Sequence, residues 1–340
     1  MLFIPKIANI ADDFGVILMV GFKKLLVTVC ATILPLVGWA QFDSQRTQYM
    51  HSVSAYNAGA IAQNDMCNVL GTYRLQWAGF SNAPTDIVVS GDIPLNISGT
   101  KHGLGVTFQN DKVGLFENQA FSLKYAYQMR LWRGTLGLGL DLGFLNQAFN
   151  FDDCVTGGSE FSNDSHKDKG SDPMLQGVSS DQNDMAFNVG FGAYYSDDEM
   201  YVGLSVLNLN KPSFEFGESE ETNIPRIFYL TGGYDMALSN EDYHLKPSAL
   251  FRTDFSTSQF DLDCLVDYKK KFMGGLGYRW GDSFDFLIGC NLLNGLFLGY
   301  AYDLPISKMI KSGGSHEVCL KYSFKLEFAK KNKYKSERIL

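Results

Sequence analysis

The sequence predicts an all-β protein, a transmembrane antiparallel β-barrel of about 14 strands preceded by a signal peptide. Three observations support this prediction. Apolar and polar residues alternate with period two from about residue 69 to residue 328, the connections between these segments alternate between short and long, and the first forty residues resemble an export signal. The composition agrees, because 14% aromatic, 19% charged and 34 Gly residues are typical of a sheet with one lipid-facing and one polar face.

Residues 1–40 are predicted to be the signal peptide. Lys23 and Lys24 form its basic region, residues 25–37 its apolar region, and Gly38 to Ala40 a small-residue cleavage site. The apolar run is too short for a good membrane-spanning helix. Because this signal begins well inside the chain, we hypothesise that translation starts at Met19.

Residues 41–68 lack a regular period. Two interpretations stay open for them: a periplasmic segment that leads into the barrel, or a plug inside its lumen. At the other end, residues 329–340 are polar and basic and are expected to form a solvated tail.

The barrel is predicted to span residues 69–328. In the segment 121–131, Phe121, Leu123 and Tyr125 alternate with Ser122 and Lys124, so that one face is apolar and the other polar. The same pattern predicts strands at 69–78, 85–95, 101–110, 118–131, 134–151, 183–195, 200–209, 225–238, 243–254, 258–269, 271–281, 283–292, 295–304 and 314–328.

The connections favour a barrel over a soluble sandwich. The even-numbered connections are short, whereas most odd-numbered ones are long, including 111–117 and the polar stretch 152–182. Barrels have tight periplasmic turns at one end and longer surface loops at the other. Aromatic residues near the predicted strand ends are expected to form interfacial girdles: Trp77, Phe80, Trp132, Tyr194, Tyr195, Tyr201, Trp280 and Tyr322.

Charged residues on the polar strand faces are expected to project into the lumen. They are Asp261, Arg279, Asp303 and Glu317. They either form a buried ionic network that holds a plug or adjacent strands, or remain separately solvated in a water-filled lumen. An ion pair between Asp303 and Arg279 is the specific hypothesis.

The sequence predicts no catalytic residue, cofactor or metal site. The five histidines form no HExxH pattern, the cysteines form no CxxC pattern, and no phosphate-binding loop is present. Ser315 and His316 are adjacent on a strand and therefore face opposite ways, which argues against a barrel hydrolase. The net charge of −8 argues against nucleic-acid binding.

Several motifs resemble those of the PorP/SprF family. RLQWAGFSNAPTD at 74–86 resembles the family's QWxGFxGAPxT signature. Further similarity lies at 56–63, 102–116, 125–131, 246–253, 274–290, 299–307 and 312–324, in the family's order. Two departures stand out, since Tyr56-Asn57-Ala58 replaces the family's Asn-Pro and Asn82 replaces its usual Gly.

The resemblance implies a non-enzymatic outer-membrane component of the type IX secretion and gliding machinery in a Gram-negative bacterium. Its partners would be outer-membrane lipid, that machinery, and a secreted or surface-anchored protein such as an adhesin. The alternative is a passive or hydrophobic-solute channel. The motif residues that we single out are Trp77, Gly79, Phe80, Pro84, Thr85, Pro247, Asp261, Tyr278, Arg279, Gly299, Tyr300, Tyr302, Asp303, Gly314, Ser315, His316 and Glu317.

Overall fold

A computed structural model describes residues 44–149, 182–214, 222–292 and 295–325. The chain divides into two units, and the barrel belongs to the unit of residues 42–254 and 259–340. The predicted signal peptide, most of the predicted 152–182 loop and the basic tail lie outside the described residues.

The described elements are mostly strands. Three short helical turns accompany them: α2 (Val53–Tyr56), η1 (Ala58–Ala60) and η5 (Lys308–Lys311). The strands are β1 (Cys67–Leu75), β2 (Thr85–Ile97), β3 (Thr100–Val113), β4 (Phe116–Leu131), β5 (Gly134–Phe149), β6 (Gln182–Ser196), β7 (Met200–Leu207), β8 (Ser213–Phe214), β9 (Thr222–Asn223), β10 (Ile227–Tyr234), β11 (Met236–Ala237), β12 (Tyr243–Thr253), β13 (Ser258–Tyr268), β14 (Phe272–Arg279), β15 (Ser283–Asn291), β16 (Leu296–Pro305) and β17 (Ser315–Phe324).

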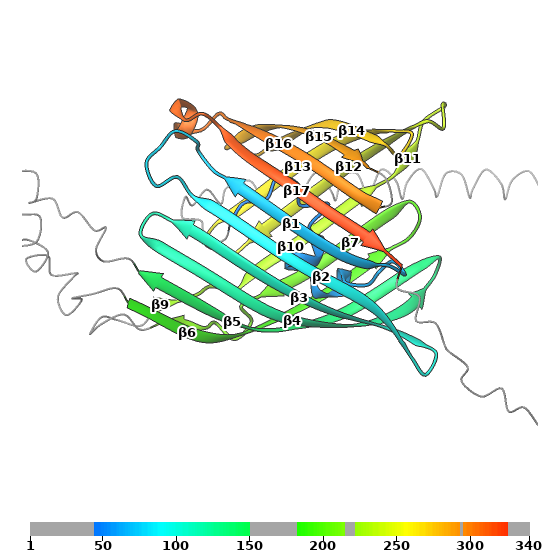
Figure 1. Ribbon diagram of the computed structural model, residues 1–340, viewed down its shortest axis with the longest axis horizontal. Coiled ribbons are helices and arrows are strands. Elements are labelled where there is room, and N and C mark those ends of the chain that lie inside the picture. The colour runs from blue at the N-terminus through cyan, green and yellow to red at the C-terminus, as the bar shows by residue number, and fades with distance from the viewer. Residues whose placement is uncertain (1–43, 150–181, 215–221, 293–294, 326–340) are drawn as a thin grey trace, which may run out of the picture. The chain divides into compact units, whose positions relative to one another are not determined.

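The sheet is a closed antiparallel barrel of 14 strands (Figure 1). Its strands follow chain order, β10 pairs with both β7 and β12, and the first strand pairs with the last, β1 with β17. The two-residue β11 only extends the pairing with β12, and β8 and β9 form a separate hairpin. Closure leaves no barrel strand with an unpaired edge, so the predicted fold class and strand number are confirmed.

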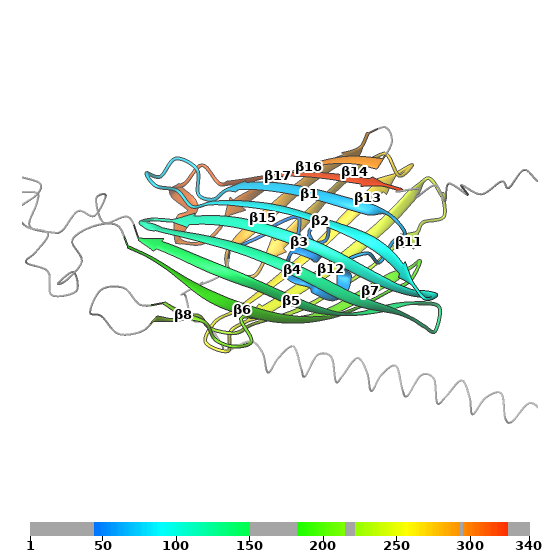
Figure 2. The same cartoon turned by 60° about the horizontal axis from the view of Figure 1, so that its bottom comes forward.

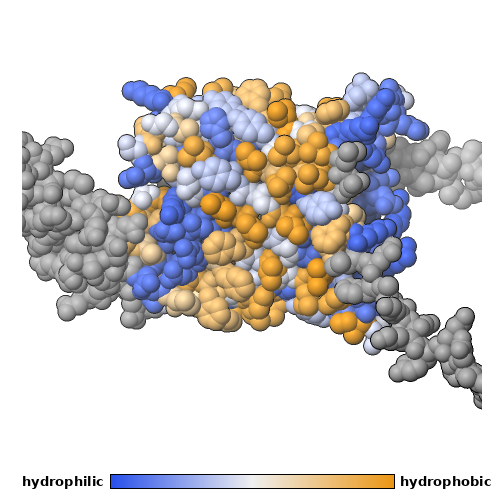
Figure 3. Space-filling model, viewed as in Figure 1, coloured by the Kyte–Doolittle hydropathy of each residue, from blue (hydrophilic) through white to orange (hydrophobic). Residues whose placement is uncertain are grey.

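The two faces of each strand differ as the alternation predicts. On β4, Leu123 is 56% exposed on the outer face, whereas its neighbour Lys124 is 2% exposed on the inner face. Figure 3 shows the apolar side chains gathered over the middle of the strands, with polar side chains towards the ends. The large apolar residues therefore cover the outside of the barrel, and the polar residues fill its interior.

The wall of the barrel varies in height. Strands β3 to β6 have 14 to 16 residues, whereas β14 and β15 have 8 and 9. About nine to eleven tilted residues cross a bilayer's hydrocarbon, so the long strands extend beyond it. Figure 2 shows this wall, from β3 to β6, on the near side of the barrel.

Three predicted boundaries are corrected by the structure. The expected long connection at 111–117 is wrong, because β3 and β4 continue to a tight turn at which Gly114 has a φ of +61°. The strand predicted to reach residue 78 ends at Leu75, since Trp77 has a φ of +52°. The strand predicted at 225–238 is interrupted at Asp235. Among the described residues, no helix has the length and apolarity needed to cross a membrane.

Candidate functional site

A segment of the chain before the first strand occupies the barrel's interior. We call residues 44–66 the lumenal segment. Tyr49, Tyr56 and Ile61 in this segment are each 1% exposed. Tyr56 stacks on Tyr229 of β10 with ring centroids 5.0 Å apart, in an apolar cluster with residues of β10 and β12. The side chains of the lumenal segment thus pack against the inward-facing side chains of the barrel wall.

One end of the lumenal segment is bound to an ionic cluster on the barrel wall. In this cluster Arg74 of β1 pairs with Asp303 of β16 at 2.7 Å and with Glu317 of β17 at 3.4 Å. Arg279 of β14 pairs with the same Asp303 at 3.0 Å and with Asp261 of β13 at 3.0 Å. All five side chains are almost completely buried. The hypothesised Asp303–Arg279 pair is therefore present, within a buried network.

Thr47 of the lumenal segment lies at the centre of the ionic cluster. Its hydroxyl lies 2.8 Å from both carboxylate oxygens of Asp303, to which it can donate its one proton, and it accepts from Arg74 at 2.8 Å and Arg279 at 3.2 Å. These bonds use the full capacity of a hydroxyl group. The backbone N–H groups of Thr47 and Gln48 each donate to one oxygen of Glu317 at 2.8 Å. The cluster thus holds the segment as well as the strands.

The other end of the lumenal segment lies against a wall of glycine residues. An added Cβ at Gly139 of β5 would meet the carbonyl of Ala58, and one at Gly137 would meet that of Gly59. At Gly192 of β6, it would meet the side-chain oxygen of Asn57. Glycine alternating with leucine on β5 therefore serves two purposes, an apolar outer face and an inner face that backbone can approach closely.

Polar side chains from the wall also satisfy the backbone of the lumenal segment. Lys124 of β4 donates to the carbonyls of Ser54 and Ala55 at 2.7 and 2.6 Å, where the short helix α2 leaves carbonyls without partners. Gln128 of β4 donates to the carbonyl of Ile61 at 2.6 Å. Since a buried backbone group without a partner is costly, these contacts fix the path of the segment.

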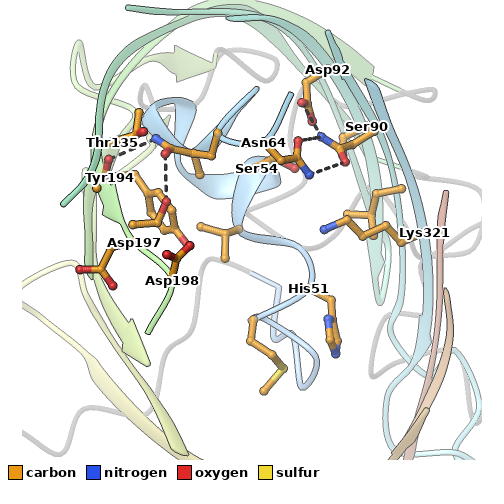
Figure 4. Close-up of a pocket in the computed structure, with 18 of the residues that line it drawn as sticks. His51, Ser54, Asn64, Ser90, Asp92, Thr135, Tyr194, Asp197, Asp198 and Lys321 are labelled. Atoms are coloured by element: carbon orange, nitrogen blue, oxygen red, sulfur yellow. Dashed lines mark hydrogen bonds between the residues drawn. The ribbon is translucent and has the colours of Figure 1, made fainter. Parts of the chain in front are cut away.

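Two cavities lie on either side of the lumenal segment. The larger, about 440 Å³, is bordered by Arg133, Asp197 and Asp198 in the short turns, and we call it the short-turn cavity (Figure 4). The smaller, about 120 Å³, is bordered by residues towards the opposite ends of the strands, such as Asn118 near the tight turn at Gly114 and Asn208 just after β7. The segment therefore lies between the two mouths of the barrel.

The described residues contain no group of three or more His, Cys, Asp or Glu side chains that could hold a metal ion. Ser315 and His316 face opposite sides of β17. Ser315 is buried and accepts a hydrogen bond from the backbone N–H of Trp77 at 3.1 Å, whereas His316 contacts the Tyr300 hydroxyl on the outer face at 2.7 Å. These two residues therefore do not form a nucleophile and base pair.

Comparison with known proteins identifies the family. Residues 39–322 match the family described as type IX secretion system membrane protein PorP/SprF. The chain belongs to this family. The match spans more than half of the chain and includes the lumenal segment, so that both the segment and the barrel lie within the matched region. No curated protein matches the chain.

Three solved structures illustrate what this PorP/SprF protein is similar to. The outer membrane protein Omp33 of Acinetobacter baumannii aligns at a TM-score of 0.43 and 6% identity, over 78% of this chain and 99% of its own. The CymD monoaromatic hydrocarbon channel aligns at a TM-score of 0.43 and 10% identity, over 86% of this chain and 95% of its own. A FadL homologue of Pseudomonas aeruginosa aligns at a TM-score of 0.40 and 10% identity, over 77% of this chain and 89% of its own.

The motif residues of this PorP/SprF protein divide between the two faces of the barrel. Inside are Asp261, Arg279, Asp303, Ser315 and Glu317, which are buried, and Gly299, where an added Cβ would meet the side-chain oxygen of Gln48. Outside or in the connections are Trp77, Gly79, Phe80, Pro84, Thr85, Pro247, Tyr278, Tyr300, Tyr302, Gly314 and His316. Gly79 and Gly314 have φ values of +95° and +83°, as turn glycines do.

Several residues of the site were not predicted from the sequence. Arg74 stands at the start of the RLQWAGF motif, and its inward parity on β1 could have revealed it. Thr47 could not have been found in this way, because the sequence around it shows no regular alternation of apolar and polar residues. The predicted aromatic girdle is wrong for Tyr194 and Tyr201, which stack on each other at 5.8 Å on the inner faces of β6 and β7.

Proposed function

We propose that this PorP/SprF protein is a non-enzymatic component of the outer membrane of a Gram-negative bacterium. It assists the type IX secretion or surface attachment of a partner protein, such as an adhesin. Its short turns face the periplasm and its long connections face the cell surface, as in bacterial barrels generally. Outer-membrane lipid surrounds the apolar outer face, and the secretion machinery and its substrate are the protein partners.

The observation that carries this proposal is the attachment of the lumenal segment. The ionic cluster holds residues 47 and 48, and the glycine wall with Lys124 and Gln128 holds residues 54–61. A diffusion channel needs a free path between its two mouths. A segment that is bonded on both sides of the lumen favours a barrel that docks proteins over one that conducts solutes.

Deletion of the gene in the source bacterium tests the proposal. We expect at least one surface or secreted protein to disappear from the cell exterior and to accumulate inside the cell, while uptake of small solutes stays the same. Quantitative mass spectrometry of the surface, medium and cell fractions measures the first effect, and uptake of labelled solutes measures the second. Expression of the intact chain from a plasmid is the control and should restore export.

The opposite result would favour the alternative, a passive or hydrophobic-solute channel. Unchanged surface and secreted proteins, together with reduced solute uptake that the plasmid restores, would contradict a role in secretion.

A further inference from the structure

Lys321 of β17 differs from the other buried or half-buried basic residues that the structure describes. Arg74, Arg279 and Lys124 have carboxylate or carbonyl partners, as do Lys101 and Lys246 with Asp65 and Asp267. Lys321 is half-buried on the inner face, yet it has no hydrogen bond or ion pair within the described chain. An inward ammonium group without a counter-ion is a site that an anionic group can complete.

The ammonium group of Lys321 points into the short-turn cavity. Figure 4 shows it directed towards the middle of this space, with Asp197 and Asp198 on the opposite side and His51 below. The cavity of about 440 Å³ is bordered on its inner side by Met50, His51 and Ser54 of the lumenal segment. A ligand would therefore enter from the short-turn end.

The carboxylates near Lys321 do not neutralise it by contact. Asp92 acts on its charge only through space, and one oxygen of Asp92 already accepts hydrogen bonds from the backbone of Ala62 and from Asn68, both at 2.9 Å. Asn68 is also paired with Asn64. The ammonium group of Lys321 therefore has no anionic group bonded to it within the described chain, and its positive charge can pair with a ligand.

We propose that the short-turn cavity binds a carboxylate of a protein chain, with Lys321 as its ion-pair partner. The carboxylate belongs either to a free C-terminus or to an Asp or Glu side chain of a protein on the periplasmic side. This site is separate from the proposed role in export, because peptide binding to the isolated barrel does not depend on which cargo is secreted.

The charges around the cavity favour a peptide carboxylate over a multiply charged anion. The cavity is bordered by three carboxylates, those of Asp92, Asp197 and Asp198, and by two cations, Lys321 and Arg133, so a phosphate group with two negative charges meets more repulsion there than a single carboxylate does. A peptide carries N–H donors beside its one carboxylate, and the cavity presents oxygen acceptors for them on Thr135, Asp198 and other residues.

Calorimetric titration of the full chain in detergent micelles tests this proposal with three peptides. They are acetyl-tetraglycine with a free carboxyl end, the same peptide with an amide end, and amidated acetyl-Gly-Glu-Gly. We expect at least one of the two carboxylate peptides to bind about tenfold or more tightly than the neutral amide, as loss of a charged hydrogen bond predicts. Which of the two binds shows whether a chain end or an acidic side chain is recognised.

Variants assign the binding to Lys321. We expect Lys321→Met to lower the affinity for the carboxylate peptide about tenfold, and Lys321→Arg to retain most of that affinity. Lys112→Met is the matched control, because Lys112 lies on β3 at the opposite end and pairs with Glu117 at 3.0 Å. Equal binding of acid and amide peptides, or equal binding by the intact chain and Lys321→Met, would overturn the proposal.

A second measurement on the unaltered chain keeps the test valid if a variant fails to fold. Bound peptide should protect Lys321, but not Lys112, from acylation by an amine-reactive reagent, as mass spectrometry of the labelled chain shows. Undiminished labelling of Lys321 at saturating peptide would also refute the site.

Discussion

The two ends of the lumenal segment are held by different physical means. On the wall formed by β13 to β17 and β1, charged side chains converge on Thr47 and Gln48. On the wall formed by β4 to β7, residues 57–59 lie against glycine backbone, and two neutral side chains of the segment donate to strand carbonyls, Asn57 to those of Ala193 and Leu204 and Gln63 to that of Tyr194. The first contact depends mainly on charged groups and the second mainly on shape, although Lys124 of β4 also donates to the carbonyls of Ser54 and Ala55.

This difference decides what each wall tolerates. In a buried ion pair, the loss of one partner leaves the other charge uncompensated, so the ionic cluster is sensitive to removal of a group. Where glycine backbone touches the segment closely, there are few side-chain atoms to remove and no space for extra ones. The glycine wall is therefore sensitive to substitutions that add side-chain atoms. The two walls should therefore respond to opposite kinds of substitution.

Arg279→Met is expected to have the largest effect. It leaves Asp261 and Asp303 without a cation that lies 3.0 Å from each, with Asp285 a further 3.9 Å contact. Breaking such a buried pair costs about 3–5 kcal/mol of unfolding free energy. Urea unfolding of the detergent-solubilised barrel measures the change, and Arg130→Met, at an exposed arginine of β4, is the control.

A double-substitution cycle with Asp303→Asn sharpens this prediction. Because Asp303 and Arg279 are direct partners, their combined loss should be smaller than the sum of the single losses by about 1 kcal/mol or more. Strict additivity would mean that the 3.0 Å contact contributes no coupling.

Gly139→Ala is expected to have an intermediate effect, on the other wall. Its methyl group would meet the Ala58 carbonyl and push the lumenal segment away from β5, at a cost of about 1–3 kcal/mol. If the segment is displaced, single-channel recordings in planar bilayers should show a larger ion current. Gly71→Ala is the matched control, because an added Cβ there meets no atom within 4 Å. An unchanged current and stability for Gly139→Ala would argue that the glycine wall is not a tight contact.

Acidification is expected to have the smallest effect, through His51 of the lumenal segment. Burial, with added repulsion from Lys321 and Lys246, lowers the pKa of His51 in the folded chain. A histidine with a lowered folded pKa stabilises the fold above its unfolded pKa of about 6.5, and this contribution declines as the pH falls below that value. Since His51 is only half-buried beside the cavity, we expect a loss of about 1 kcal/mol or less between pH 7 and pH 5.

Comparison of the intact chain with His51→Gln at the two pH values isolates this effect from that of the carboxylates. The urea midpoint of the intact chain should fall more than that of the variant. An equal fall in both would show that His51 takes no part in the acid response.

The barrel was predictable from sequence because its pattern is local. Side-chain direction in a strand repeats every two residues, so the apolar Leu123 and the charged Lys124 predict opposite faces from their neighbours alone. The exceptions are single residues with positive φ, such as Trp77, where a strand stops although its pattern continues.

The lumenal segment was not predictable to the same degree, because its structure depends on distant residues. Thr47 and Glu317 are separated by 270 positions, and no period in residues 44–66 indicates which residues meet the wall. The inward parity of Asp261, Arg279, Asp303 and Glu317 predicted the charged side of the lumen. Their arrangement around Thr47 required the structure.

The pairing of the first and last strands has a consequence for how the protein is made. Arg74 lies on β1 and Glu317 on β17, 243 positions apart and directly opposite each other across the closing seam. Asp303, the other partner of Arg74, also lies near the end of the chain, on β16. Arg74 therefore lacks both carboxylates until β16 and β17 are in place, so the ionic anchor of Thr47 and Gln48 is complete only when the barrel closes.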